Sequence, residues 1–383
     1  MILGKRSDTR AEMLALRKVL REQGYFDKPT GRHVASWGAH VVVALVALLV
    51  VCIARAWAVR AGALVVTTFS FLCLATIGHT ASHGGLSKRS VVNDVVLYFT
   101  YPFLLGLSAR YWMKSHVIIH HPAPNRVGVD RDCDLRPIFA LNEEHAHASS
   151  SIGRAYRRVQ GLLLPILLPF NGFGIQVQAW RALLGELFAD GLKPRAVLDL
   201  ACLFAHVVVF VVMPCLWLGP EKALLIHAAR ISIIGMALFA VLAPGHYPAQ
   251  AACVGPAIDG EDFAFRQAIA TVNFRTGFIG RMMCNGLEFQ LEHHLFPTIS
   301  HLHLPAVSVH VREFCERVGL PHRTLSWPRA IWESYRVFFV AKVVEHGPFG
   351  VEAVDASEES KVTPIHEPKT ESPSSWPSQE RVA

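Results

Sequence analysis

The stretch Phe289-Gln290-Leu291-Glu292-His293-His294-Leu295-Phe296-Pro297 is the part of the chain around which the rest is organised. Its two adjacent histidines, with Gln290 shortly before them, can present three nitrogen or oxygen donors toward one point. Glu292 and Gln290 can fix the ring tautomers, as hydrogen-bonding partners of metal-bound imidazoles usually do. A His-His pair by itself indicates little, because most such pairs are solvated or satisfied by backbone carbonyls.

Two further histidine clusters lie upstream of this stretch. His79 and His83 are four residues apart, and His116 and His120 repeat that spacing with His121 as an additional ring. Positions i and i+4 lie on one helix face, so each cluster can present its rings together. The three clusters together predict a metal site, although the second cluster alone would also fit a solvated basic helix.

The number of histidines indicates more than one metal ion. With His246, which follows an apolar run, the candidate ligands are eight: His79, His83, His116, His120, His121, His246, His293 and His294. A structural zinc takes four ligands and closes, whereas two metals with about four imidazoles each and an open position would use all eight. Imidazole suits iron, zinc and copper alike. The assignment of His246 as a ligand has the least support, because a single histidine at the end of a span is more often an interfacial residue.

The composition predicts an integral membrane protein. Hydrophobic residues make up 52% of the 383 residues, charged residues only 17%, and the apolar residues are concentrated in long runs. The formal net charge of +7 is modest and suits anionic lipid head groups better than nucleic acid. The eight cysteines include no Cys-x-x-Cys pair, so neither a disulfide framework nor a zinc ribbon is indicated. The charged N-terminal region shows no cleavable signal peptide.

Four apolar runs are long enough to cross a bilayer, which needs about 20 residues. They cover residues 34–54, 62–78, 197–218 and 223–243. The basic residues before the first run place the N-terminus in the cytosol, and an even number of spans then puts all three histidine clusters on the cytosolic face. We therefore expect an all-α integral membrane protein with four transmembrane helices and a cytosolic helical cap that holds a two-metal site.

The flanking segments complete this expected organisation. Residues 1–33 form a cytosolic segment with a short amphipathic, solvated helix near residues 11–20, residues 34–344 form the membrane domain, and residues 345–383 form a disordered tail. Residues 91–107 and 161–175 are apolar but broken by proline, glycine and polar residues. We expect them to be interfacial or re-entrant, because broken helices are tolerated at membrane depth only where protein covers the backbone.

At the histidine clusters the chain resembles the membrane fatty acid desaturases. The resemblance is carried by Gly78-His79 to His83-Gly84, by Trp112 with His116 to His121 and the following Pro122-x-Pro124-Asn125, and by Gln290 to Pro297. It extends from the first span to about His322. The third cluster, with glutamine in its first position after a phenylalanine, is similar to the front-end, or acyl-lipid, subgroup.

The resemblance implies a non-haem di-iron centre that uses dioxygen and two external electrons to remove two hydrogens from adjacent methylenes of a fatty acyl chain. It implies one iron held by His79, His121, His246 and His294, and a second held by His83, His116, His120 and His293. Gln290 stands where other branches have a ninth histidine and would be a weak ligand or a partner of one. Trp112 would line the acyl channel, although core packing explains it equally well.

The sequence departs from the family pattern at three points. Thr80 stands where the family often has aspartate, so an orienting carboxylate must come from elsewhere, with Asp130, Asp132 and Asp134 as candidates. The second cluster has three residues between its first two histidines rather than the commoner two. The His-Pro-Gly-Gly signature of a fused cytochrome b5 domain is missing. Electrons are therefore expected from a separate ferredoxin or cytochrome b5 type protein with its reductase.

Several alternatives stay open at this point. A hydroxylase or acetylenase would use the same three clusters, and the acyl carrier could be CoA, acyl carrier protein or a lipid. A membrane zinc hydrolase would need fewer ligands, and a metal transporter would place its ligands within the spans. The spans carry few such groups, chiefly His206 and His227. A bacterial cytoplasmic membrane is favoured over the endoplasmic reticulum.

Overall fold

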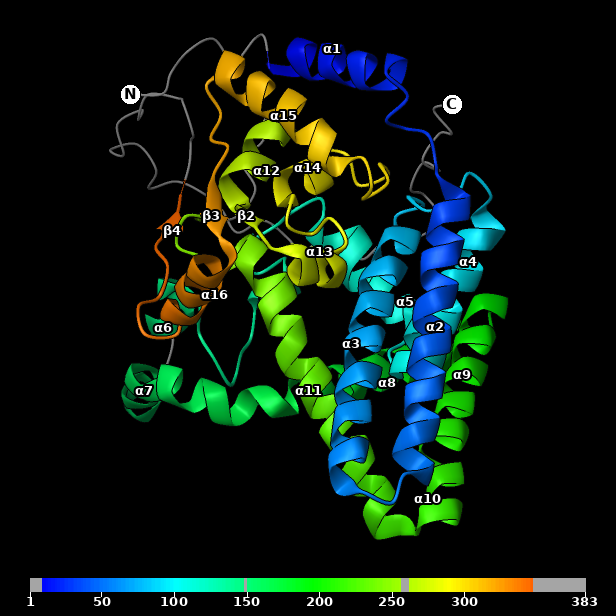
Figure 1. Cartoon of the computed structure of the whole chain (residues 1–383). Helices are drawn as coiled ribbons and strands as arrows, with labels where there is room; N and C mark the ends of the chain where they lie inside the picture. Colours follow the sequence, from blue (N-terminus) through cyan, green and yellow to red (C-terminus); the bar gives the residue numbers. More distant parts are fainter. Residues whose placement is uncertain (1–8, 148–149, 256–261, 347–383) are drawn as a thin grey trace. The chain divides into compact units, whose positions relative to one another are not determined.

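The computed structural model describes residues 9–147, 150–255 and 262–346, and this part of the chain is mostly helical (Figure 1). The predicted disordered tail lies outside it except for its first two residues. Four long helical segments correspond to the four predicted spans: α2 (Thr30–Ile53), α3 (Trp57–Ser82), the continuous run of α9 (Pro194–Val207), η6 (Val208–Val212) and α10 (Met213–Leu218), and α11 (Pro220–His246). Each is apolar enough to cross a membrane.

A fifth helical segment is also long and apolar enough to cross a membrane. It joins α7 (Ser151–Leu167), η5 (Leu168–Phe170) and α8 (Asn171–Asp190), with a mean hydropathy of 1.4, the lowest of the five. The helix continues through Pro165, and Pro169 lies at the start of a 3₁₀ turn, where its missing N–H is tolerated. Gly172 lets α8 approach α11, because a Cβ there would lie 2.7 Å from the carbonyl oxygen of Ile231. The expectation that this region is broken was therefore wrong as regards the helix itself.

A bent helix pair carries the second histidine cluster. α4 (Ser90–Tyr98) continues into η2 (Phe99–Leu105), and after a short turn α5 (Ala109–Trp112) continues into η3 (Met113–His120). The chain bends by 113° between the two halves. The turn includes Gly106 in the left-handed region, with φ 69°, where a Cβ would lie 2.8 Å from Nε2 of His206. Glycine is required there for both its backbone angle and its size.

Side chains from three neighbouring helices satisfy the backbone at the end of η2. They belong to α8, α9 and α11 and donate to three successive carbonyl oxygens: Gln176 Nε2 to Leu105 (2.8 Å), His206 Nδ1 to Phe103 (2.8 Å) and Arg230 Nη1 to Leu104 (3.4 Å). Carbonyls left free at a helix end must find such partners when water is absent. The fully buried Arg230 also lies over the rings of Phe71 and Phe210.

The start of α5 on the other side of the turn is held by one carboxylate. Asp199 of α9 is completely buried, and it accepts hydrogen bonds from the Ser108 hydroxyl (2.7 Å) and from the backbone N–H groups of Ala109 (3.2 Å) and Arg110 (2.9 Å). A carboxylate is stabilised at a helix N-terminus because it meets unpaired N–H groups there. The bend is therefore fixed from both sides, and with it the direction of the helix that bears His116.

The remaining helices and strands cover the histidine-bearing ends of α3 and α11 (Figure 1). Two parallel two-stranded sheets pair β1 with β4 and β2 with β3. The elements are α1 (Thr9–Glu22), η4 (Arg131–Cys133), α6 (Glu143–His147), β1 (Cys253–Val254), α12 (Phe263–Ala270), β2 (Asn273–Arg275), α13 (Phe278–Cys284), α14 (Gln290–Leu295), α15 (Leu304–Val318), β3 (Thr324–Ser326), α16 (Trp327–Arg336) and β4 (Val344–Glu345).

The amphipathic helix expected near residues 11–20 forms as α1, but it is not solvated all round. Leu16 and Leu20 are buried in one cluster with side chains of α12, α14 and α15, among them Val311 and Phe314. Arg317 of α15 adds an ion pair to Glu12, with 3.2 Å between Nε and Oε2. The apolar stripe of α1 thus belongs to the same core as the third histidine cluster.

Replacing Leu20 by alanine should destabilise the protein by about 2–5 kcal/mol, because it leaves a cavity in this core. Thermal unfolding of the purified protein in detergent measures the effect as a lower midpoint. Leu14→Ala is the matched control, since Leu14 lies on the same helix and is 62% exposed. Equal midpoints for the two variants would show that α1 does not pack as described.

Candidate metal centre

Eight histidines from four separate regions of the chain converge where the long helices meet the covering elements. His79 lies in the last turn of α3 and His83 directly follows that helix. The other six come from η3 and its end (His116, His120 and His121), the last residue of α11 (His246) and α14 (His293 and His294). All eight side chains are buried.

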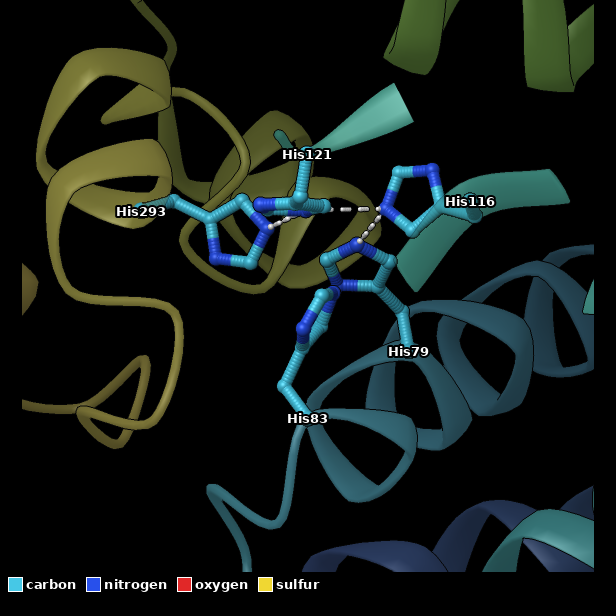
Figure 2. A group of neighbouring side chains, drawn as sticks. All are labelled: His79, His83, His116, His121 and His293. Atoms are coloured by element: carbon cyan, nitrogen blue, oxygen red, sulfur yellow. Dashed lines mark hydrogen bonds between the residues drawn. The ribbon is translucent and has the colours of Figure 1, made fainter. Parts of the chain in front are cut away.

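Five of the rings form one group, shown in Figure 2. One ring nitrogen each of His79, His83, His116, His121 and His293 lies within 4.8 Å of the others. Nε2 of His116 is 2.8 Å from Nε2 of His79 and 3.2 Å from Nε2 of His121, which in turn is 3.1 Å from Nε2 of His293. These rings point toward one another across the gap between α3, η3 and α14.

The remaining three histidines, His120, His246 and His294, form a second group, in which one nitrogen of each ring also lies within 4.8 Å of the others. Nε2 of His120 is 3.2 Å from Nε2 of His246. The side-chain amide of Gln290 lies 2.7 Å from that same His246 nitrogen. His121 joins the two groups, because its ring stacks on that of His294 with 4.3 Å between the centroids.

The donor set fits bound metal. Nε2 of His83 and Nε2 of His294 are buried and have no hydrogen-bond partner. Metal–imidazole bonds of about 2.0–2.1 Å place neighbouring ligand nitrogens about 3–4 Å apart, which is close to the spacings found here. Burial, together with the neighbouring imidazoles, lowers the pKa of His293 and of His294 well below the ordinary value. That shift favours the neutral ring, which is the form that binds metal.

The outer nitrogens of three rings donate to fixed acceptors. Nδ1 of His120 donates to Asp130 (2.9 Å), Nδ1 of His294 to the side-chain oxygen of Gln267 (2.9 Å), and Nδ1 of His246 to the carbonyl of Ala270 (3.1 Å). Such bonds leave Nε2 of each ring facing the centre of the site. The three rings that are held in this way are those of the second group.

Only part of the predicted carboxylate support reaches the site. Asp132 lies 3.5 Å from His116 and 3.7 Å from His120, whereas Asp134 pairs with Arg136. The Thr80 hydroxyl lies 2.9 Å from Nδ1 of His301.

Glu292 turns away from the metal groups. Its carboxylate accepts hydrogen bonds from Asn273 (2.7 Å) and His322 (2.8 Å), and these bonds hold α14 against β2 and the segment before β3. The suggestion that Glu292 fixes the ring tautomers is thus wrong, while Gln290 does contact a ring. Gln267 was missed by sequence reasoning, because nothing in its local pattern distinguishes it from an ordinary polar residue of α12.

Trp112 packs directly on the site. Its ring stacks on His116 with 4.3 Å between centroids, and its indole N–H donates to Ser82. A role in an acyl channel stays a prediction. The grouping of five and three histidines differs from the four-and-four division implied by the resemblance, so the assignment of each ligand to one ion also stays a prediction.

These observations define the class of the protein: it is helical, has several helices long enough to cross a membrane, and contains a buried centre of histidines. Its sequence from residue 55 to residue 326 matches the model of the family described as fatty acid desaturase. This match covers well over half of the chain, and the chain belongs to that family.

Known desaturases are 25–29% identical to it over the regions that align. Examples are an acyl-lipid (7-3)-desaturase of Chlamydomonas reinhardtii (28% identity over 64% of this chain and 49% of the relative), a Delta(5) fatty acid desaturase of Caenorhabditis elegans (28%, 68% and 59%) and an sn-1 linoleoyl-lipid 6-desaturase of Synechocystis (27%, 72% and 77%). The chain thus spans about half to three fifths of the length of the first two relatives.

Replacing Asp130 by asparagine should weaken metal binding about 10- to 100-fold, because His120 then loses the carboxylate that orients its ring. Anaerobic titration of the metal-free protein with Fe²⁺ measures the change. Asp134→Asn serves as the control, since Asp134 belongs to the same loop but pairs with Arg136. Unchanged affinity in Asp130→Asn would mean that this carboxylate does not support the site.

Proposed function

We propose that this protein introduces a carbon–carbon double bond into a fatty acyl chain at a histidine-ligated di-iron centre. The observation that carries the proposal is the convergence of eight buried imidazoles, four of which have a ring nitrogen without a hydrogen-bond partner, in a member of the fatty acid desaturase family. Two irons held there would supply the activation of dioxygen. The protein's own groups orient the ligand rings and keep bulk water away from them.

The balance of the reaction calls for an electron donor. Removing two hydrogens from the acyl chain supplies two electrons, whereas reducing dioxygen to two water molecules takes four. The other two electrons, with two protons, come from outside, and we expect a ferredoxin or cytochrome b5 type donor with its reductase. The acyl substrate would be linked to CoA, acyl carrier protein or a lipid.

A basic surface near the third histidine cluster would suit an acidic donor. Six arginines lie in this region of the sequence: Arg275, Arg281, Arg312, Arg317, Arg323 and Arg329. Arg317 is engaged by Glu12, and Arg323 is half-buried with a hydrogen bond to the carbonyl of Ala268. The remaining four are exposed, and they are the ones we propose for donor docking, with lipid phosphate as the competing partner.

Expression in a host of simple fatty acid composition, followed by mass spectrometry of its lipids, tests the activity. We expect acyl chains with one additional double bond, and none from His294→Ala at a matched protein level, because ligands of one centre act as a unit. Hydroxylated or acetylenic products would favour those alternatives on the same scaffold. Purified protein with zinc in place of about two irons would contradict the proposal and favour a hydrolase or a transporter.

We further propose four membrane spans, with both termini and the metal centre on the cytosolic face of a bacterial cytoplasmic membrane. In support, the α2–α3 and α10–α11 connections lie at the same end of the long helices, opposite the covering elements, and α7 runs across their direction (Figure 1). The bent pair would then be re-entrant, with its backbone satisfied by protein.

This topology predicts where an added cysteine can be labelled in intact cells. A membrane-impermeant thiol reagent should reach a cysteine at Trp57, which is 81% exposed next to the first connection. It should not reach a cysteine at Phe278, equally exposed at 81% among the covering elements, until the cells are opened. The reverse pattern, or labelling of both positions in intact cells, would contradict the arrangement.

A further inference from the structure

His246 is the candidate ligand with the least support from its own neighbourhood in sequence. It is the last residue of α11 and stands beyond Pro244, where the regular helix is ending. Its ring direction is set on one side by the bond from Nδ1 to the carbonyl of Ala270. The backbone carbonyl of His246 is held by other contacts, which come from two segments distant in sequence.

The carbonyl oxygen of His246 accepts two side-chain hydrogen bonds. Nζ of Lys342 donates to it at 2.8 Å and also to the carbonyl of Ala251 at 2.6 Å. Nδ2 of Asn125 donates to it at 3.0 Å and also lies within 3.1 Å of the carbonyl of Ala252. The end of α11 is thereby tied to the segment that follows it and to the loop after the second histidine cluster.

Asn125 also links His246 to its partner in the second group. Its backbone N–H donates to Oδ2 of Asp130 at 2.8 Å, and the same oxygen accepts from Nδ1 of His120. Asn125 holds a left-handed backbone with φ 55°. His120 and His246, whose Nε2 atoms lie 3.2 Å apart, are thus both linked to Asn125, His120 through Asp130 and His246 through its carbonyl.

Lys342 is an unusual residue in its setting. Its side chain is buried, and within the described residues it has no carboxylate ion-pair partner. Leaving a charged ammonium buried is costly unless strong acceptors surround it, and here two carbonyl oxygens do so. Its backbone is fixed as well, donating to the carbonyl of Leu141 and accepting from the N–H of Glu143. Lys342 also lies beyond residue 326, where the match to the family ends.

We propose that Lys342 is a positioning residue of the metal centre, which holds His246 in place through its carbonyl together with Asn125. It acts on the second histidine group, and among the described residues its side chain makes no hydrogen bond to the group of five. Loss of the lysine donors should therefore weaken one metal site selectively. The proposal rests on the metal centre proposed above, and the experiment separates failure of one from failure of the other.

Titration of the metal-free full-length protein with Co²⁺, followed by visible absorption, measures the two sites without any need for turnover. Wild type should bind two ions per chain. Lys342→Met keeps the aliphatic chain and removes the donors, and it should weaken one of the two sites about 10- to 100-fold while the other is unchanged. Asn125→Gly, which keeps the left-handed backbone and the bond to Asp130, should weaken the same site.

Two controls separate positioning from general loss of structure. Lys18→Met removes an exposed lysine and should leave both sites intact. Leu20→Ala lowers stability in the core beside α14 without removing a hydrogen-bond donor to His246, and it should also bind both ions. Wild-type affinity at both sites in Lys342→Met and Asn125→Gly, or equal loss at both sites, would overturn the proposal. A wild-type chain that binds no Co²⁺ would overturn the metal centre itself, and the role of Lys342 with it.

Discussion

Burying eight imidazole rings together is the constraint on which the rest of this structure depends. Each ring has two nitrogens, and a buried polar nitrogen without a partner is costly. The inner nitrogens face one another, so the surrounding protein satisfies mainly the outer ones, with Gln290 at Nε2 of His246 as the exception. Asp130, Gln267 and the carbonyl of Ala270 do this for one group, and they come from three different segments. The covering elements are thus arranged so that they supply hydrogen-bond acceptors to the outer ring nitrogens.

Much of the candidate site could be predicted from sequence, because its signal is local. The spacing of four residues in His79/His83 and in His116/His120 directly reports a shared helix face. The four longest apolar runs likewise predicted α2, α3, α9–α10 and α11, since a bilayer fixes the length of a span. The α7–α8 segment was expected to be broken, because Pro165 near the end of α7, Pro169 in a 3₁₀ turn and glycines at a close helix contact look the same in sequence as breaks.

The partners of the rings could not be predicted, because their signal is not local. Gln267 and Lys342 reach the site from positions that carry no pattern, and Lys342 lies 96 residues from the histidine that it contacts. Asp199 and Arg230 could be noticed as charges within apolar runs, yet their partners are backbone groups at a bend. Only the folded chain brings such pairs together. Thr80 shows the same limit, since the side chain that it meets, His301, is 221 residues away.

The bend after η2 has a consequence for the order in which the protein is made. The carbonyls of residues 103–105 leave the ribosome well before the side chains that satisfy them, which follow 71, 103 and 126 residues later. A carbonyl without a partner is not tolerated in the hydrocarbon region. In the proposed re-entrant arrangement of the bent pair, the nascent segment would stay in contact with water until α11 has been synthesised. Membrane integration of the second histidine cluster would then be a late event in biogenesis, completed only when the helical bundle closes around it.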